Sequence, residues 1–201
     1  MTDECEGAAT RTGGTALCRL LVVSLLLCGV PAPATAQDPP SEHEVKAVFL
    51  YNFAKFVSWP PGAFPNPETS VVLCIVGADP FGSLLESTTR GETVEGRAIE
   101  LRRLTVEGDL RSCHILFVSS SERRRLGRVL EALDGASVLT VGEMDDFAEL
   151  GGIVRFTKER YRIGIEVNIE AAERANLKIS SRLLSLALVV RARGGSARLP
   201  R

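Results

Sequence analysis

Apolar residues recur three and four positions apart between residues 42 and 57, which is the spacing of one face of a helix. Ser41 and Glu44 form a capping box, which predicts that the helix begins directly after Ser41. Other apolar residues fill most of the opposite side, so we expect this helix to be covered on more than one face. Pro60 and Pro61 cannot donate the next helical hydrogen bond, and they predict where the helix ends.

From residue 71 the pattern changes to short apolar runs that are separated by helix and turn signals. The first run is continuous and β-branched, which is typical of a buried strand. Alternation of strands and helices at this spacing predicts βαβ units, and therefore a mostly parallel sheet with helices on both faces. The pattern predicts strands at 71–76, 99–104, 114–118 and 137–141, a helix at 81–87 capped by Asp79, and a helix capped by Ser119 that runs through Leu133.

The last third of the domain has a different pattern. Residues 151–156 and 162–167 flank a turn at 158–160, which predicts an antiparallel hairpin at one edge of the sheet. The sheet is then mixed, and the predicted fold class is a single α/β domain. Helices are predicted at 169–175 and 181–190, followed by a disordered basic tail at 191–201.

The first 36 residues have the layout of a secretory signal peptide. Two arginines precede an apolar run at residues 20–30, which is too short to span a membrane as a helix. An A-x-A site follows, and it predicts cleavage after Ala36 and release into the periplasm. The alternative is a lipoprotein anchored through Cys28. Leu27 stands where a small residue is expected before such a cysteine, which favours cleavage.

Cleavage after Ala36 shortens the chain from 201 to 165 residues, with the predicted domain at 37–190. The leader holds two arginines and three acidic residues, so 22 basic and 22 acidic residues remain and the net charge is zero. A neutral chain lacks the positive field that attracts nucleic acid or an anionic membrane. We therefore expect neither of them as a partner.

The exported chain keeps two cysteines, Cys74 and Cys113. In an oxidising compartment these two residues are candidates for one disulfide. The alternative is a pair of buried free thiols, because cysteine is among the most buried residue types. The sequence favours the disulfide and leaves the geometry open.

No arrangement of residues in the chain predicts catalysis, a metal site or a cofactor. His114 directly follows Cys113 on a predicted strand, so the two side chains point to opposite faces and cannot bind one metal, and His43 lies at a helix start. The segment 77–82 lacks the glycine and lysine pattern of a phosphate loop. The serines at 119–121 lack the glycines of an esterase elbow and are explained by helix capping.

Six segments of the chain form one ordered set, namely VKAVFLYNFAKFVSWP, LCIVGADPFG, GRAIELRRL, CHILFVSSSE, VLTVGEMDDFAELGGIVRF and GIEVNIEAAERANLKISSRLLSLA. Together, over residues 44–190, they resemble the YfiR-like family of exported bacterial proteins. The resemblance implies a periplasmic α/β domain without known catalysis. It also implies a homodimer that binds the periplasmic portion of an inner-membrane diguanylate cyclase and represses it, in response to the redox state of the envelope. The family's first cysteine pair corresponds to Cys74 and Cys113, whereas a second pair of the repressors, near 147–153, has no counterpart here.

Aromatic residues are concentrated between residues 49 and 64. The helical spacing of Phe49, Phe53 and Phe56 favours the core. Trp59 lies past the predicted helix end, and tryptophan is prominent among residues that anchor protein interfaces. We therefore predict that Phe56 and Trp59 form the edge of a protein-contact surface on a non-enzymatic regulator. The alternative is a small-molecule-binding module whose pocket lies between the aromatic helix and a strand end.

Overall fold

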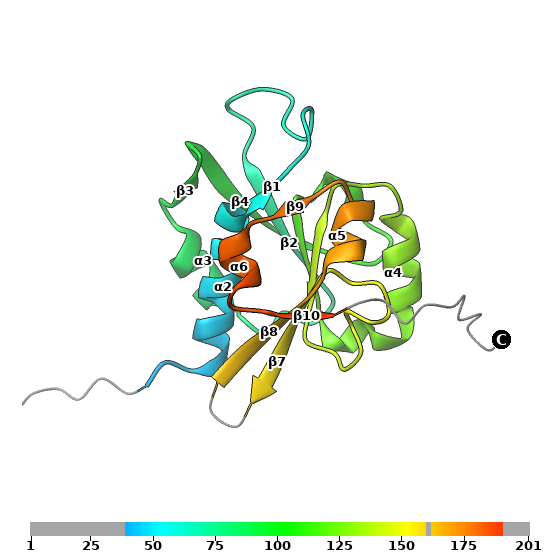
Figure 1. The fold of residues 1–201 in the computed structure, drawn as a ribbon. Helices are drawn as coiled ribbons and strands as arrows, with labels where there is room; N and C mark the ends of the chain where they lie inside the picture. Colours follow the sequence, from blue (N-terminus) through cyan, green and yellow to red (C-terminus); the bar gives the residue numbers. More distant parts are fainter. Residues whose placement is uncertain (1–38, 160–161, 191–201) are drawn as a thin grey trace, which may run out of the picture. The chain divides into compact units, whose positions relative to one another are not determined.

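The computed structural model describes residues 39–159 and 162–190 (Figure 1). The predicted leader, with Ala36 and Cys28, lies outside the described residues, as do the predicted tail at 191–201 and part of the turn at 158–160. The helical elements are α2 (Glu42–Phe56), α3 (Ser83–Thr89), α4 (Leu126–Ala132), α5 (Ile169–Arg174) and α6 (Ser181–Leu184), with the 3-10 turns η1 (Leu110–Ser112) and η2 (Ser120–Arg125). The strands are β1 (Val57–Ser58), β2 (Val71–Val76), β3 (Thr93–Val94), β4 (Arg97–Leu104), β5 (Ile115–Val118), β6 (Leu139–Gly142), β7 (Val154–Glu159), β8 (Arg162–Asn168), β9 (Lys178–Ile179) and β10 (Leu188–Val190).

Eight strands form one sheet in the order β10-β8-β7-β6-β5-β2-β4-β3. Neighbours from β4 through β7 run parallel, and the pairs β7–β8 and β3–β4 are antiparallel. The predicted mixed α/β sheet is therefore confirmed. Strand β2 lies between β4 and β5, because the chain first crosses to one side of β2 and then to the other.

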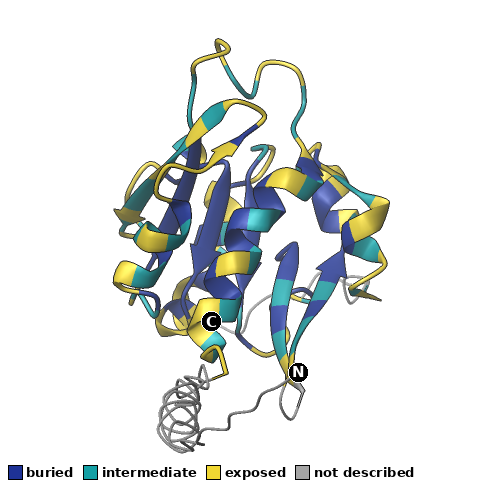
Figure 2. Ribbon diagram, turned by 90° about the vertical axis from the view of Figure 1, so that its left-hand side faces the viewer, coloured by how far each residue is buried: buried dark blue, intermediate teal, exposed yellow. Residues whose placement is uncertain are grey.

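The sheet has helices on both faces, and two separate cores result (Figures 1 and 2). Side chains alternate along a strand, so Leu73 and Ile75 of β2 face α2 and α3, whereas Cys74 and Val76 face α4. All six residues of β2 are buried, as the continuous apolar run predicted. Ala171 of α5 joins the core on the α2 side.

The predicted helix at 181–190 is wrong beyond Leu184. The chain leaves α6 and forms the short strand β10, in which Val189 lies opposite Val167 of β8. A short apolar run does not distinguish a strand from a helix by periodicity, and here the free edge of β8 supplies the hydrogen-bond partners. The hairpin of β7 and β8 lies at this end of the sheet as predicted, with β10 added outside it.

The helix α2 ends before the two prolines rather than at them. Ser41 caps its start with the predicted capping box. At the other end Val57 takes an extended conformation and pairs with Ile179 of β9, so pairing with a distant segment ends the helix at Phe56, four residues before Pro60. The bounds of the other elements differ from the prediction by a few residues. For example, Asp79 forms a turn with Phe81 and delays the start of α3.

Candidate functional site

The rings of Trp59, Phe64 and His114 form an aromatic cluster. Trp59 and Phe64 belong to the loop between β1 and β2, which is drawn in cyan at the top of Figure 1. The Phe64 ring stacks on His114 with centroids 4.3 Å apart and planes 5° apart, and the Trp59 ring meets both edge-on at 6.0 and 6.1 Å. His114 lies directly before β5, so the cluster fixes this loop over the amino ends of the central strands.

The imidazole of His114 is fully hydrogen-bonded to backbone groups. Its Nδ1 accepts from the N–H of Val72 at 3.0 Å, so Nε2 carries the proton and donates to the carbonyl oxygen of Ala63 at 3.2 Å. Burial lowers the pKa of His114, and the charges of Arg97 and Arg102 lower it further, against the hydrogen bond to Ala63, which raises it. The ring is therefore neutral at neutral pH.

Arg97 of β4 holds the far part of the same loop. Its Nη1 donates to the carbonyl oxygens of Asn66, Pro67 and Thr69 at 2.7, 2.9 and 3.0 Å. The guanidinium also lies over the ring of Phe64, 4.3 Å from its centroid, which is the geometry of a cation–π contact. The loop is thus attached to two strands that lie on either side of β2.

A hollow of about 510 Å³ opens between this loop and the η1 turn. Cys113 forms part of its wall, and the structure joins Cys113 to Cys74 of β2 by a disulfide, with Cα atoms 5.9 Å apart. The bond ties β2 to the segment that enters β5, as the disulfide prediction required. The hollow is lined by Ala63, Pro65, Thr69, Val72, Arg102, Arg111, Ser112, Cys113, His114, Ala136 and Ser137.

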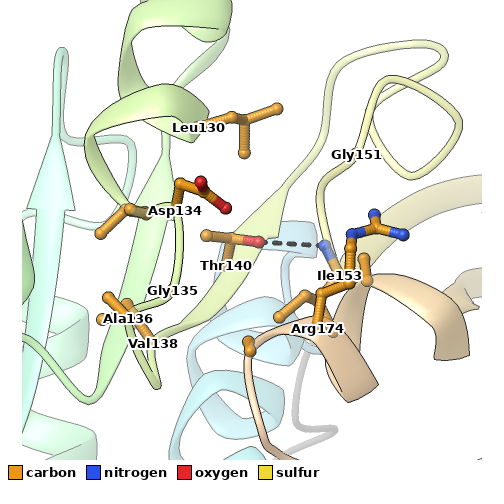
Figure 3. Close-up of a pocket in the computed structure, with 12 residues that line it drawn as sticks. Leu130, Asp134, Gly135, Ala136, Val138, Thr140, Gly151, Ile153 and Arg174 are labelled. Carbon is orange, nitrogen blue, oxygen red and sulfur yellow. Dashed lines mark hydrogen bonds between the residues drawn. The ribbon is translucent and has the colours of Figure 1, made fainter. Parts of the chain in front are cut away.

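A second cavity, between α4 and α5, has a volume of only about 80 Å³ (Figure 3). Leu130 and Ile153 line it, Thr140 accepts a hydrogen bond from the N–H of Ile153, and Asp134 and Arg174 also lie in its wall. Pockets for organic ligands usually measure about 300–1,000 Å³. This cavity is therefore too small for such a ligand, whereas the hollow beside His114 is within the range.

Apolar side chains are exposed along α2 and along the segment from α6 to β10. Val48 of α2 is 48% exposed, and Leu186 and Leu188 are 65% and 63% exposed. Figure 1 shows α6 lying across α2. Phe56 is half-buried beside this surface, with the guanidinium of Arg182 of α6 6.0 Å from its ring. We call these residues the α2–α6 surface.

The two predicted contact residues do not lie against each other. Among the described residues, the aromatic neighbours of Trp59 are Phe64 and His114, and Phe56 is not one of them. Phe49 and Phe53 pack on Phe156 of β7, as expected of core residues. Trp59 therefore belongs to the loop at the hollow, and Phe56 belongs to the α2–α6 surface.

Sequence reasoning missed a buried lysine. Lys46 of α2 is 5% exposed and donates to Glu42 at 2.6 Å and to Glu143, after β6, at 2.7 Å. Burial lowers the pKa of Lys46, but the hydrogen bonds to Glu143 and Glu42 outweigh it, so the pKa is raised overall. Glu42 and Lys46 stand four residues apart, which was the available signal. Glu143 could not be identified from the sequence.

The described residues contain no group of three or more histidine, cysteine or acidic side chains that could hold a metal ion. Within the same residues no helix is long and apolar enough to cross a membrane.

Two solved structures resemble the fold at low sequence identity. One is the crystal structure of a conserved domain protein from Vibrio cholerae O1 biovar El Tor, with 14% identity and a TM-score of 0.53 over 74% of this chain. The other is an ABC domain in complex with L-Trp from Streptococcus pneumonia, with 10% identity over 72% of this chain. Its TM-score of 0.47 is too low to support any argument. The chain spans 60% of the length of each.

No curated protein matches the chain. The sequence profile of the YfiR/HmsC-like family matches residues 43–188, which is most of the described chain, and it confirms the resemblance seen in the sequence. The chain therefore belongs to the YfiR/HmsC-like family, whose members are periplasmic regulators of cyclic di-GMP signalling rather than catalysts.

Proposed function

We propose that this protein is a periplasmic repressor that binds the periplasmic portion of a membrane-anchored diguanylate cyclase and acts as a homodimer. Membership of the family supports the signalling context. The observation that carries the proposal is the α2–α6 surface, where α2 contacts α6 and where Val48 of α2 and Leu186 and Leu188 after α6 are exposed. Exposed large apolar side chains on neighbouring elements are a feature of interaction sites. Relief of repression raises intracellular cyclic di-GMP.

Phe56 and Trp59 are the proposed contact residues. Phe56 is half-buried at the end of α2, and the guanidinium of Arg182 of α6 lies 6.0 Å from its ring, so a partner that covers the α2–α6 surface also covers this ring. Trp59 directly follows β1, on the loop over the hollow, and extends the contact to that loop. Large aromatic side chains in such positions contribute most of the binding energy of many interfaces.

The test is the intracellular cyclic di-GMP concentration in a strain that lacks this gene. We expect the concentration to rise, and the intact gene to restore it. Val48→Asp and Phe56→Ala should fail to restore it, because a charge or a lost ring at the α2–α6 surface weakens the contact. Leu150→Asp is the matched control, since Leu150 is 55% exposed but lies in the connection from β6 to β7, next to α4.

Trp59→Ala separates an interface role from a core role. If Trp59 is an interface anchor, the substitution weakens partner binding by about 2 kcal/mol or more. If it is core, the free energy of unfolding falls by roughly 3–5 kcal/mol. The urea midpoint and the affinity for the partner's periplasmic portion, measured on the same variant, distinguish the two roles. Unchanged affinity in the folded fraction removes Trp59 from the proposed surface.

The alternative function, a small-molecule-binding sensor, is supported by one feature. The hollow beside His114 has the volume of a ligand pocket, and three residues of the Trp59 loop line it. A ligand there and a protein partner on the α2–α6 surface are compatible in one regulator. If the repressor needs no ligand, a substitution that fills the hollow should leave repression unchanged.

A further inference from the structure

The hollow beside His114 is built from three segments that meet at the amino ends of β2 and β5. The loop after β1 contributes Ala63, Pro65 and Thr69. Residues 111–114, from η1 and the link to β5, form the second segment, and residues 136–137 before β6 form the third. With about 510 Å³ it has room for a small organic molecule. It lies at the opposite end of the strands from the carboxyl ends, where sheets of this type usually bind ligands.

The charged groups in the wall of the hollow are both cationic, namely Arg102 of β4 and Arg111 of η1. Arg102 uses Nε to pair with Glu100 and points Nη1 towards the hydroxyl of Ser112 at 3.5 Å. Arg111 uses Nη1 to cap the carbonyl oxygens of Ala132 and Asp134. Among the described residues the other guanidinium nitrogens have no hydrogen-bond partner, so N–H donors remain on both side chains.

Positive charge faces the hollow, because Arg102 and Arg111 are its charged lining residues, with Arg102 also paired to Glu100. The charges of Arg97 and Arg102 add to burial in lowering the pKa of His114. The rest of the wall is largely apolar, with Pro65, Val72 and the disulfide-bonded Cys113. The lining therefore combines two cationic donors, a few hydroxyls and an apolar floor.

We propose that this hollow binds a small organic carboxylate, with the carboxylate on the free guanidinium donors of Arg102 and Arg111 and a compact apolar body against Val72 and Cys113. Arginine suits this role because its planar fork matches a carboxylate. An inorganic anion alone would leave the apolar part of the wall uncovered. The inference concerns the hollow only and does not depend on the repression proposed above.

The fluorescence of Trp59 can be used to detect ligand binding in the hollow. This residue is the only tryptophan of the chain, and its ring lies 6.1 Å from that of His114. His114 lines the hollow and bonds to Ala63, a further lining residue. A ligand that contacts this wall should change the fluorescence of Trp59 without any added label.

The test is a titration of the purified chain with sodium benzoate, followed by Trp59 fluorescence and by the amide NMR signals of residues 112–114. Benzoate has one carboxylate on a compact apolar ring, and we expect a dissociation constant on the order of 1 mM for so small a ligand. Benzamide has the same shape without the charge. It should bind at least about 10-fold more weakly.

Arg102→Gln removes the guanidinium and should weaken benzoate binding by about 10-fold. The matched control is Arg103→Gln, since Arg103 is the next residue of β4, points to the other face of the sheet and pairs with Asp79 and Glu86. It should leave the affinity unchanged. The proposal is overturned if tens of millimolar benzoate move none of the amide signals, if benzamide binds equally well, or if Arg102→Gln has no effect.

Discussion

The imidazole of His114 joins three parts of the chain, and only its neutral form can do so. Protonation of Nδ1 would place a hydrogen against the N–H of Val72, which now donates to that atom. Because the pKa of His114 in the folded state is lowered from 6.5, chiefly by burial, its contribution to stability is complete above pH 6.5. The contribution is lost as the pH falls below that value. We expect the free energy of unfolding to decrease from about pH 6.5 downwards.

Urea unfolding followed by Trp59 fluorescence measures this effect at a series of pH values. In His114→Gln the decrease below pH 6.5 should largely disappear, whereas His43→Gln should retain it, because His43 is exposed on the first turn of α2. An identical pH profile in the wild type and in His114→Gln contradicts the assignment. His43→Gln is the matched control, since His43 and His114 are the two histidines of the chain.

Glu42 predicts a separate loss of stability in more acidic solution. Its hydrogen bonds to Lys158 and Lys46, both at 2.6 Å, lower its pKa from 4.5 to about 2. The contribution of ionised Glu42 to the free energy of unfolding is therefore present above pH 4.5 and is lost as the pH falls towards 2. The carboxylate is partly in water, so we expect about 1 kcal/mol at most. Glu42→Gln should remove this step from an acid-unfolding curve.

The control for Glu42 is Glu107→Gln, because Glu107 is exposed and forms no ion pair within residues 39–159 and 162–190. It should leave the acid-unfolding curve as it is. A curve for Glu42→Gln that coincides with that of the wild type would show that the two lysines do not stabilise the folded state through Glu42.

At the scale of elements, the disulfide between Cys74 and Cys113 joins β2 to the entry of β5. It closes a loop of 39 positions, for which the chain-entropy model gives roughly 4 kcal/mol. Both cysteines are buried in the core on the α4 side. The double variant Cys74→Ala, Cys113→Ala should unfold with a free energy lower by about 2–4 kcal/mol.

Thiol titration of the denatured, unreduced protein is the direct measurement for the disulfide. It should detect no free thiol in the chain isolated from the periplasm. Two free thiols would contradict the bond and leave the pair as packed core, which is the alternative that the sequence left open.

Phe147 packs directly against two glycines, Gly142 and Gly152. It is completely buried, and a Cβ atom at Gly152 or Gly142 would lie 2.1 or 2.5 Å from its ring. Gly152→Ala should therefore destabilise the fold by about 1–3 kcal/mol through overpacking. Adding Phe147→Leu should recover part of the loss.

Helices and strands could be predicted where the apolar pattern was long or where a capping residue marked the start of a helix. The capping box at Ser41 and the β-branched run at 71–76 both gave correct elements, because local hydrogen bonds and burial decide them. The prediction was wrong at 185–190, where the backbone of β8 turned an apolar run into a strand. It was also wrong at Val57, whose strand partner is more than a hundred residues away.

At the scale of the whole molecule, the alternation of strands and helices was enough to predict the sheet, but it could not predict the hollow. The hollow depends on backbone carbonyls that accept from His114 and Arg97 across the fold, and a carbonyl has no sequence signature. The ion pair between Lys46 and Glu143 also joins distant segments, so it too could not be predicted from the sequence. Residue types in the sequence indicated which chemistry was available, whereas contacts between distant segments of the chain formed the hollow beside His114.

The last prediction concerns the whole chain as it exists in the cell. The apolar run at 20–30 and the A-x-A site predict removal of residues 1–36 on export. Mass spectrometry of the native protein should therefore find an amino terminus at Gln37, since the signal peptidase cuts after small residues and Ala36 provides one. Changing Ala34 and Ala36 together to Leu should leave the uncleaved form in the membrane fraction. A chain that begins at a lipidated Cys28 would contradict this route, and it would place the domain on a membrane anchor instead of free in the periplasm.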